Sequence, residues 1–108
     1  MISIILPIRN EAKYIKQTLE SILNQNNINQ EIEILIADGL SNDSTREIIE
    51  EYIKINGNIQ LIDNPEYLVS TGFNRALSTA RGDFITRVDG HSEIEHNFIK
   101  NSLKLFET

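Results

Sequence analysis

The side chains that could do chemistry in this sequence fall into four groups, and each group directly follows an apolar run. Carboxylates, amides, one arginine and one imidazole recur in these groups. Together they indicate a site for a nucleotide and a metal ion. The groups are Pro7, Arg9, Asn10 and Glu11; Asp38, Gly39, Ser41, Asn42 and Asp43; Asp63 and Asn64; and Asp89, Gly90 and His91.

The run Asp89-Gly90-His91 offers two metal ligands. A carboxylate and an imidazole stand two residues apart, and the glycine between them lets the backbone bend. Mg²⁺ and Mn²⁺ both accept a carboxylate oxygen, and Mn²⁺ also accepts an imidazole nitrogen. Two ligands do not make a tight site, so diphosphate oxygens of a bound nucleotide would complete the coordination shell. The alternative is that His91 is an exposed turn residue.

Asp38 ends an apolar run, where its carboxylate could accept a hydrogen bond from the N–H of a base. The alternative is that Asp38 only caps the next helix, although Asp43 is better placed for that role. The four groups as a whole also have a simpler interpretation, because Asp, Asn, Ser and Gly are common turn residues. Their recurrence after four separate apolar runs favours a ligand site.

Composition and missing motifs exclude several classes of protein. The formal net charge of −6 argues against a nucleic-acid-binding protein, which needs a basic surface. The chain has no cysteine, which excludes disulfides, thiolate catalysis and cysteine-ligated metals. It also has neither the Gly-x-Gly-x-x-Gly run of dinucleotide-binding domains nor the Gly-x-x-x-x-Gly-Lys-Ser/Thr run of P-loop proteins.

The elements that must position these groups alternate along the chain. Short β-branched runs predict strands at residues 2–6, 32–37, 59–62 and 83–88, and Pro7 is expected to end the first. Apolar residues at helical spacing predict a helix after each strand. The first opens at Asn10 and Glu11, the second follows the cap-competent residues 41–44, the third is closed by Gly82, and the last starts at Glu95. Residues 24–30 are expected to form a loop, and the last helix is expected to turn Phe98, Ile99, Leu103 and Phe106 inward.

The order βαβαβαβα predicts an α/β fold, a Rossmann-like and mostly parallel sheet with helices on both faces. Ligands of such sheets bind outside the carboxyl ends of the strands, where all four polar groups fall. A chain of 108 residues, 40% of them hydrophobic, predicts one domain with one core. No apolar run could span a bilayer and residues 1–7 do not resemble a signal peptide, so the expected compartment is the cytoplasm.

Four stretches of the chain match a known pattern: IILPIRNE at residues 4–11, IADGLSNDST at 36–45, GFNRA at 72–76 and ARGDFITRVDGH at 80–91. In this order and spacing they resemble the N-terminal half of family 2 inverting glycosyltransferases, which have the GT-A fold. The resemblance spans nearly the whole chain. It is strongest to the bacterial exopolysaccharide enzymes of the succinoglycan type.

The resemblance implies roles for the matching residues. Pro7, Arg9 and Glu11 would line the nucleotide pocket, and Asp38 would contact the base, usually uracil. Asp89 would also lie against the nucleotide, at its diphosphate.

The resemblance also implies a divalent metal, Mn²⁺ or Mg²⁺, held by Asp89 and His91 on the diphosphate of the donor. His91 departs from the family pattern, which has a second Asp at this position. The metal ligands of this chain are therefore expected to differ from those of the family at one position.

The implied activity is transfer of a sugar from a nucleotide-sugar donor, a UDP-sugar, to a saccharide or lipid-linked acceptor in bacterial polysaccharide synthesis. Family members usually continue well beyond this length, and the further part carries the acceptor site, the general base and any membrane-associated segment. We therefore interpret residues 1–108 as the donor part, with the acceptor half absent and the catalytic base unknown. Peripheral association with the inner face of the membrane would come through the absent part, and an uncovered sheet edge predicts a homo-oligomer.

Two other classes of function are compatible with parts of the pattern. One is a nucleotide-binding or assembly fragment without turnover, which binding and turnover assays would distinguish from an enzyme. The other is a receiver-like signalling domain on a similar sheet. That class needs paired acids after the first strand and a phosphoacceptor Asp after the third, and Arg9-Asn10-Glu11 fits it poorly.

Overall fold

The β-branched runs form a four-stranded sheet in which every neighbouring pair is parallel. The computed structural model describes residues 1–25 and 30–107, with the strands in the order β3-β2-β1-β4. The strands are β1 (Ile2–Ile8), β2 (Ile32–Asp38), β3 (Ile59–Asp63) and β4 (Phe84–Arg87). Because β1 pairs on both sides, all seven of its residues are buried, as the sequence predicts for a continuous apolar run.

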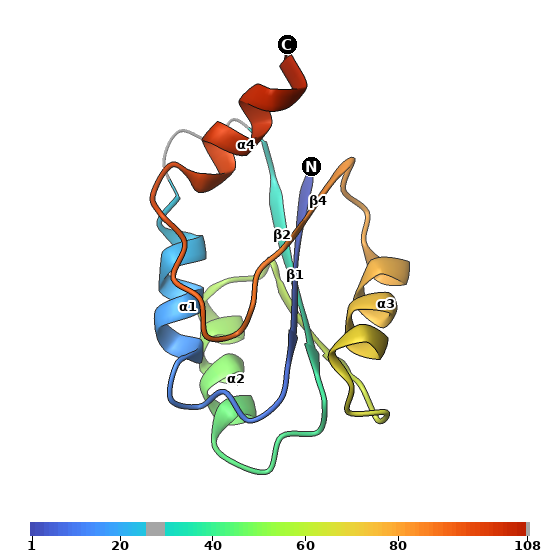
Figure 1. The fold of residues 1–108 in the computed structure, drawn as a ribbon. Coiled ribbons are helices and arrows are strands. Elements are labelled where there is room, and N and C mark those ends of the chain that lie inside the picture. Colours follow the sequence, from blue (N-terminus) through green and yellow to red (C-terminus); the bar gives the residue numbers. More distant parts are fainter. Residues whose placement is uncertain (26–29, 108) are drawn as a thin grey trace.

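Helices cover both faces of the sheet, as Figure 1 shows. Three of them, α1 (Ile15–Leu23), α2 (Thr45–Ile55) and α4 (Phe98–Glu107), supply side chains to one core cluster. The fourth, α3 (Val69–Thr79), packs alone on the opposite face. The predicted α/β class with a parallel sheet between helices is confirmed.

Alternation along β1 divides the core between these two faces. Ile4 and Leu6 point to the face of α1 and α2, where they pack with Leu19 and Ile49. Ile5 points to the other face, where it packs with Ala76 of α3. The side chains of a strand alternate between the two faces, so one continuous apolar run serves both layers.

The strand β1 runs to Ile8, through Pro7, instead of ending before the proline. Pro7 pairs in register with Ala37 of β2, whereas β4 is in register with β1 only as far as Ile5. The proline therefore lies past the last β1–β4 pair, where its missing N–H costs no ladder hydrogen bond on that side.

The helix α1 begins at Ile15, so the predicted start at Asn10 and Glu11 is wrong. Asn10 has a left-handed backbone with φ of 55°, which a right-handed helix excludes. Its N–H donates to Ser41 in the next βα loop, and the N–H of Glu11 donates to Thr45 at the start of α2. Contacts between loops thus override the local helical pattern.

Gly82 is not the C-cap of α3, because that helix ends at Thr79 with Ala80 as its cap, and no glycine among the described residues has a positive φ. Gly82 is needed for close approach. A Cβ there would lie 2.6 Å from Ser3 Oγ, and its N–H donates to the same hydroxyl at 2.9 Å. The following strand β4 is one residue shorter at each end than predicted.

The last helix begins three residues later than predicted, at Phe98 instead of Glu95. Ile99 is buried and Leu103 packs against the core as expected, but Phe98 is 37% exposed and does not point inward. The side chain of Phe106 lies outside the described residues, as does most of the loop predicted at 24–30. Across the described residues, none of the helices combines the length and apolarity needed to cross a bilayer.

Candidate functional site

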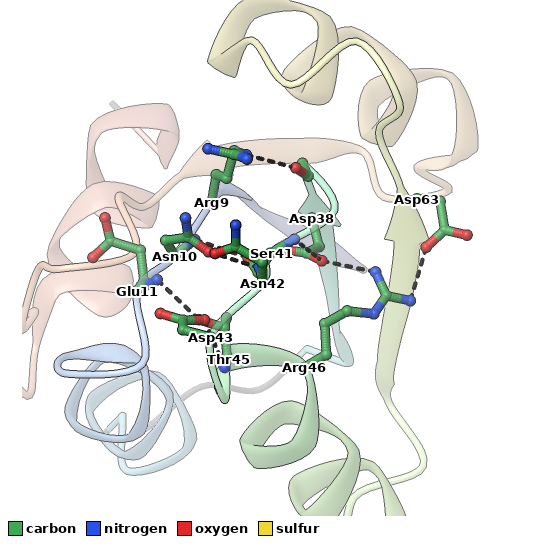
Figure 2. A network of polar contacts seen from close by, with 11 residues as sticks. Arg9, Asn10, Glu11, Asp38, Ser41, Asn42, Asp43, Thr45, Arg46 and Asp63 are labelled. Atoms are coloured by element: carbon green, nitrogen blue, oxygen red, sulfur yellow. Dashed lines mark hydrogen bonds and ion pairs between the residues drawn. The ribbon is translucent and has the colours of Figure 1, made fainter.

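The loops after β1 and β2 are joined by hydrogen bonds at the carboxyl edge of the sheet, as Figure 2 shows. The N–H of Asn10 donates to Ser41 Oγ at 2.8 Å, and the N–H of Asn42 donates to Asn10 Oδ1 at 2.9 Å. The N–H of Glu11 donates to Thr45 Oγ1 at 2.9 Å. These contacts join the two loops to each other.

Asp43 supports the start of α2, although the N-cap of this helix is Ser44 and not Asp43 as the sequence suggests. Its carboxylate accepts from the N–H of Thr45 at 2.9 Å, from the Thr45 hydroxyl, and from the N–H of Ala12 at 3.3 Å. Partial burial alone would raise the pKa of Asp43, but the hydrogen bonds from Thr45 and Ala12 outweigh it and leave the pKa below its usual value. The Asp43 carboxylate therefore stabilises the backbone at the start of α2 and in the loop after β1.

Asp38 lies at the end of β2 with its side chain fully buried. Its carboxylate accepts from the N–H of Ser41 at 3.1 Å, from the Ser41 hydroxyl, and from Arg46 Nη1 at 2.7 Å. Arg46 Nη2 also lies 2.8 Å from Asp63 Oδ1 at the end of β3. The hydrogen bond to Asp38 is the main cause that raises the pKa of Arg46. Figure 2 shows Arg46 between the two carboxylates.

Arg9 lies across the end of β2. Its Nε donates to the carbonyl oxygen of Gly39 at 2.9 Å, and its Cζ lies 5.2 Å from the centroid of the Tyr67 ring. Pro7 is buried near the end of β1, beside Gly72 of α3. The edge thus combines one buried proline with one exposed guanidinium.

The run Asp89-Gly90-His91 packs against the end of β1. A Cβ at Gly90 would lie 2.5 Å from Ile8 Cγ2, so only glycine fits there. The carbonyl oxygen of Gly90 accepts from the buried Thr18 hydroxyl at 3.1 Å. With Gly90 packed in this way, His91 Nδ1 lies 3.7 Å from Glu11 Oε1. Asp89 Oδ1 lies 3.2 Å from Arg87 Nη2, and half of the Asp89 side chain is exposed.

Asp38 and Asp89 follow the carboxyl ends of β2 and β4, which lie on either side of β1, so their predicted place at one edge of the sheet is confirmed. That both carboxylates face one cleft stays a prediction, because Asp38 is fully buried against Ser41 and Arg46. A family model decides what kind of protein carries this edge: the glycosyl transferase family 2 model matches residues 3–108. The chain belongs to glycosyl transferase family 2.

Relatives agree with this family. A dolichyl N-acetyl-alpha-D-glucosaminyl phosphate 3-beta-D-2,3-diacetamido-2,3-dideoxy-beta-D-glucuronosyltransferase of Methanococcus voltae is 37% identical, over 98% of this chain and 34% of its own. The structure of TarS 1–349 from S. aureus in complex with UDP-GlcNAc is 26% identical, with a TM-score of 0.83, over 98% of this chain and 31% of that one. The chain thus spans about a third of the length of these relatives.

A third comparison concerns the fold alone. The mannosyltransferase PcManGT from Pyrobaculum calidifontis, in complex with GDP-Man and Mn²⁺, superposes with a TM-score of 0.89 at 22% identity, over 99% of this chain and 32% of that one. It is similar to this chain in its backbone, and GT-A glycosyltransferases are thereby confirmed as the fold class.

Two residues of this family 2 edge were missed by sequence reasoning. Arg46 could have been found, because a cation in the first turn of a helix opposes the helix dipole and indicates a carboxylate partner nearby. Tyr67 gives no comparable signal, since only the fold brings the loop after β3 to Arg9 and Gly39.

Within residues 1–25 and 30–107, no three acidic or histidine side chains are grouped so that they alone could hold a metal ion. Asp89 and His91 still offer one oxygen donor and one nitrogen donor on a single turn. The Asp89 side chain is 49% exposed and the His91 side chain is 62% exposed. Two donors do not make a tight metal site, so a metal held by Asp89 and His91 stays a prediction that needs further ligands, such as diphosphate oxygens.

Proposed function

We propose that this chain is the donor-binding part of a glycosyltransferase that takes its sugar from a UDP-sugar. The observation that carries the proposal is the edge on which the β1 and β2 loops are locked together and Glu11 meets His91, in a chain matched by the family 2 model over residues 3–108. The relative TarS, crystallised with UDP-GlcNAc, supports a uracil nucleotide as the donor.

The roles proposed for the nucleotide-contacting residues follow their positions. Pro7 lies near the end of β1 and Arg9 directly follows this strand, with its side chain bonded to Gly39 after β2. There they would line the nucleotide pocket with Glu11. Asp38 would contact the base. Because its oxygens are bonded to Ser41 and Arg46, this contact requires one of these partners to share or release an oxygen.

The metal, Mn²⁺ or Mg²⁺, would be held by Asp89 and His91. The residues fit this role, because Gly90 is locked against Ile8 and Thr18 while the two donor side chains project to solvent. A bound divalent ion supplies charge neutralisation for the diphosphate leaving group. Arg87 holds Asp89 at 3.2 Å and orients its carboxylate.

The acceptor is proposed to be a saccharide or a lipid-linked saccharide of polysaccharide synthesis. The name of the Methanococcus voltae relative, which includes a dolichyl N-acetylglucosaminyl phosphate, supports the lipid-linked form. We place the reaction in the cytoplasm, at the inner face of the membrane.

Self-association is proposed to use exposed apolar side chains such as Ile85 on the edge strand β4. Light scattering on a size-exclusion column tests this, and a monodisperse monomer would contradict it.

Calorimetry with UDP and Mn²⁺ tests the donor site through one matched pair of variants. Asp89→Ala removes the oxygen donor and should abolish the gain in UDP affinity that Mn²⁺ gives. Asp83→Ala is the control, because Asp83 is an exposed carboxylate at the opposite end of the same strand. Equal loss of metal-dependent affinity in both variants, or in neither, would contradict the proposed role of Asp89.

A further inference from the structure

Two bulky residues at the carboxyl edge are both strained and exposed. Leu40, after β2, and Tyr67, after β3, have φ values of 54° and 66°, a left-handed conformation that is unusual for such side chains. Their side chains are 38% and 53% exposed, so burial of these side chains does not explain the strain. Strained backbone that the surroundings hold in place clusters at ligand sites.

The loop that carries Tyr67 is fixed by a buried residue. Asn64 is 2% exposed, and its Nδ2 donates to the carbonyl oxygen of Leu68 at 2.8 Å. The N–H of Asn64 donates to the carbonyl oxygen of Asp38, also at 2.8 Å, and the N–H of Tyr67 donates back to the carbonyl oxygen of Asn64 at 3.2 Å. These hydrogen bonds therefore fix the backbone of the loop that carries Tyr67.

Gly39 is the point at which three loops meet. A Cβ at Gly39 would lie 3.1 Å from the carbonyl oxygen of Tyr67 and 3.2 Å from Arg9 Cδ, so these groups are in close contact across the glycine. Arg9 donates to the Gly39 carbonyl oxygen and holds its guanidinium over the Tyr67 ring, 5.2 Å from the ring centroid. In Figure 2, Arg9 lies on the opposite side of the polar network from Arg46.

The place of this pair in the sheet fits one end of a nucleotide. Tyr67 packs against Gly39 beyond the end of β2, and Asp89 follows β4. The order β3-β2-β1-β4 separates β2 from β4 by two spacings, roughly 10 Å. A nucleoside diphosphate has its base and its terminal phosphate at opposite ends. With the diphosphate at Asp89, the base would reach toward the ends of β2 and β3, where Tyr67 and Arg9 present a planar aromatic and a planar cation.

We propose that Tyr67, aligned by Arg9 and Gly39, forms a stacking surface for the donor's base and is a binding residue of the donor site. This rests on the proposed function, since it presumes a nucleotide with its diphosphate at Asp89. Stacking on an exposed aromatic ring strengthens base binding roughly tenfold. Leu40, beside Gly39, offers apolar surface next to it.

Calorimetry with two probes, UDP and inorganic diphosphate, each with Mn²⁺, tests the proposal. Tyr67→Ala should weaken UDP binding roughly tenfold and leave diphosphate binding unchanged, whereas Tyr67→Phe should keep both. Tyr67→Gly is a second variant whose backbone readily adopts a positive φ, so its loop is kept while the ring is removed. Tyr14→Ala is the control, because Tyr14 is also an exposed tyrosine with a cation, Lys13, over its ring.

The outcomes separate this proposal from the donor function on which it rests. UDP affinity within twofold of the unaltered chain in both Tyr67→Ala and Tyr67→Gly would overturn the stacking role. Parallel loss of UDP and diphosphate binding would overturn it too, since the residue would then act on the whole site. If the unaltered chain bound neither probe, the donor function itself would fail and the Tyr67 proposal with it.

Discussion

Replacing Arg46 by methionine is expected to destabilise the fold strongly, because it leaves the Asp38 carboxylate buried without its cation. Asp38 is fully buried, whereas Arg46 is about one-third exposed, so the pair is buried on one side only. Removing one partner of a buried ion pair costs about 3 to 5 kcal/mol of stability. Because two hydrogen bonds from Ser41 to the Asp38 carboxylate remain, the expected loss is at the lower end of this range, about 3 kcal/mol. For a domain of this size that corresponds to a fall in Tm of roughly 10 to 20 °C.

Thermal unfolding followed by circular dichroism measures this effect, and Lys54→Met is the matched control. Lys54 pairs with Glu51 on the same helix at 3.1 Å, with both side chains about 70% exposed, so its loss should cost under about 0.5 kcal/mol. Adding Asp38→Asn to Arg46→Met should recover part of the loss, because a neutral amide replaces the unpaired charge. Equal changes in Tm for Arg46→Met and Lys54→Met would refute the reasoning.

Three further predictions follow from single features of the edge. Asp43→Asn should lower the free energy of unfolding at neutral pH, and the difference from the unaltered chain should vanish in acid. The pKa of Asp43 in the folded chain lies below the usual 3.8, so its stabilisation is present above pH 3.8 and is lost as the pH falls through the folded pKa. Urea titrations across pH 2 to 7 check this, and a pH-independent difference would contradict it. Gly90→Ala should lower the free energy of unfolding by about 1 to 3 kcal/mol, because the new Cβ would collide with Ile8. Gly57→Ala, with open space around it, should change this free energy by less than about 0.5 kcal/mol in the same assay. Similar losses in the two variants would argue against the packed turn at Gly90. The chain alone should show no multiple-turnover sugar transfer from UDP-GlcNAc, because donor, acceptor and base must be held together, and robust turnover would mean that a base lies within these residues.

The fold could be predicted from the sequence because its main signals are local. Continuous β-branched runs gave the strands, and strict alternation with helical patterns implied a parallel sheet with the polar groups at one edge. The start of α1 could not be predicted, since Asn10 and Glu11 are held outside the helix by Ser41 and Thr45, residues about 30 positions away in the chain. Gly82 was misread for a similar reason, because its neighbour in space is Ser3.

The candidate site was predictable in its position more than in its internal contacts. The carboxyl ends of strands gather the four polar groups in any such sheet, so the neighbourhood of Glu11 and His91 follows from topology. The partners of Asp38 do not, because Arg46 reaches it from the first turn of α2 only once helix and strand have packed. The same holds for Arg9 and Tyr67, which belong to loops that meet only at Gly39.

The affinity of the unaltered chain for UDP, measured by calorimetry with and without Mn²⁺, tests the central claim most directly. A donor site whose metal is held by Asp89 and His91 predicts saturable one-to-one binding that strengthens at least tenfold when Mn²⁺ is present and weakens again when the ion is chelated. Undetectable binding of UDP under both conditions, or an affinity that Mn²⁺ leaves unchanged, would contradict the account.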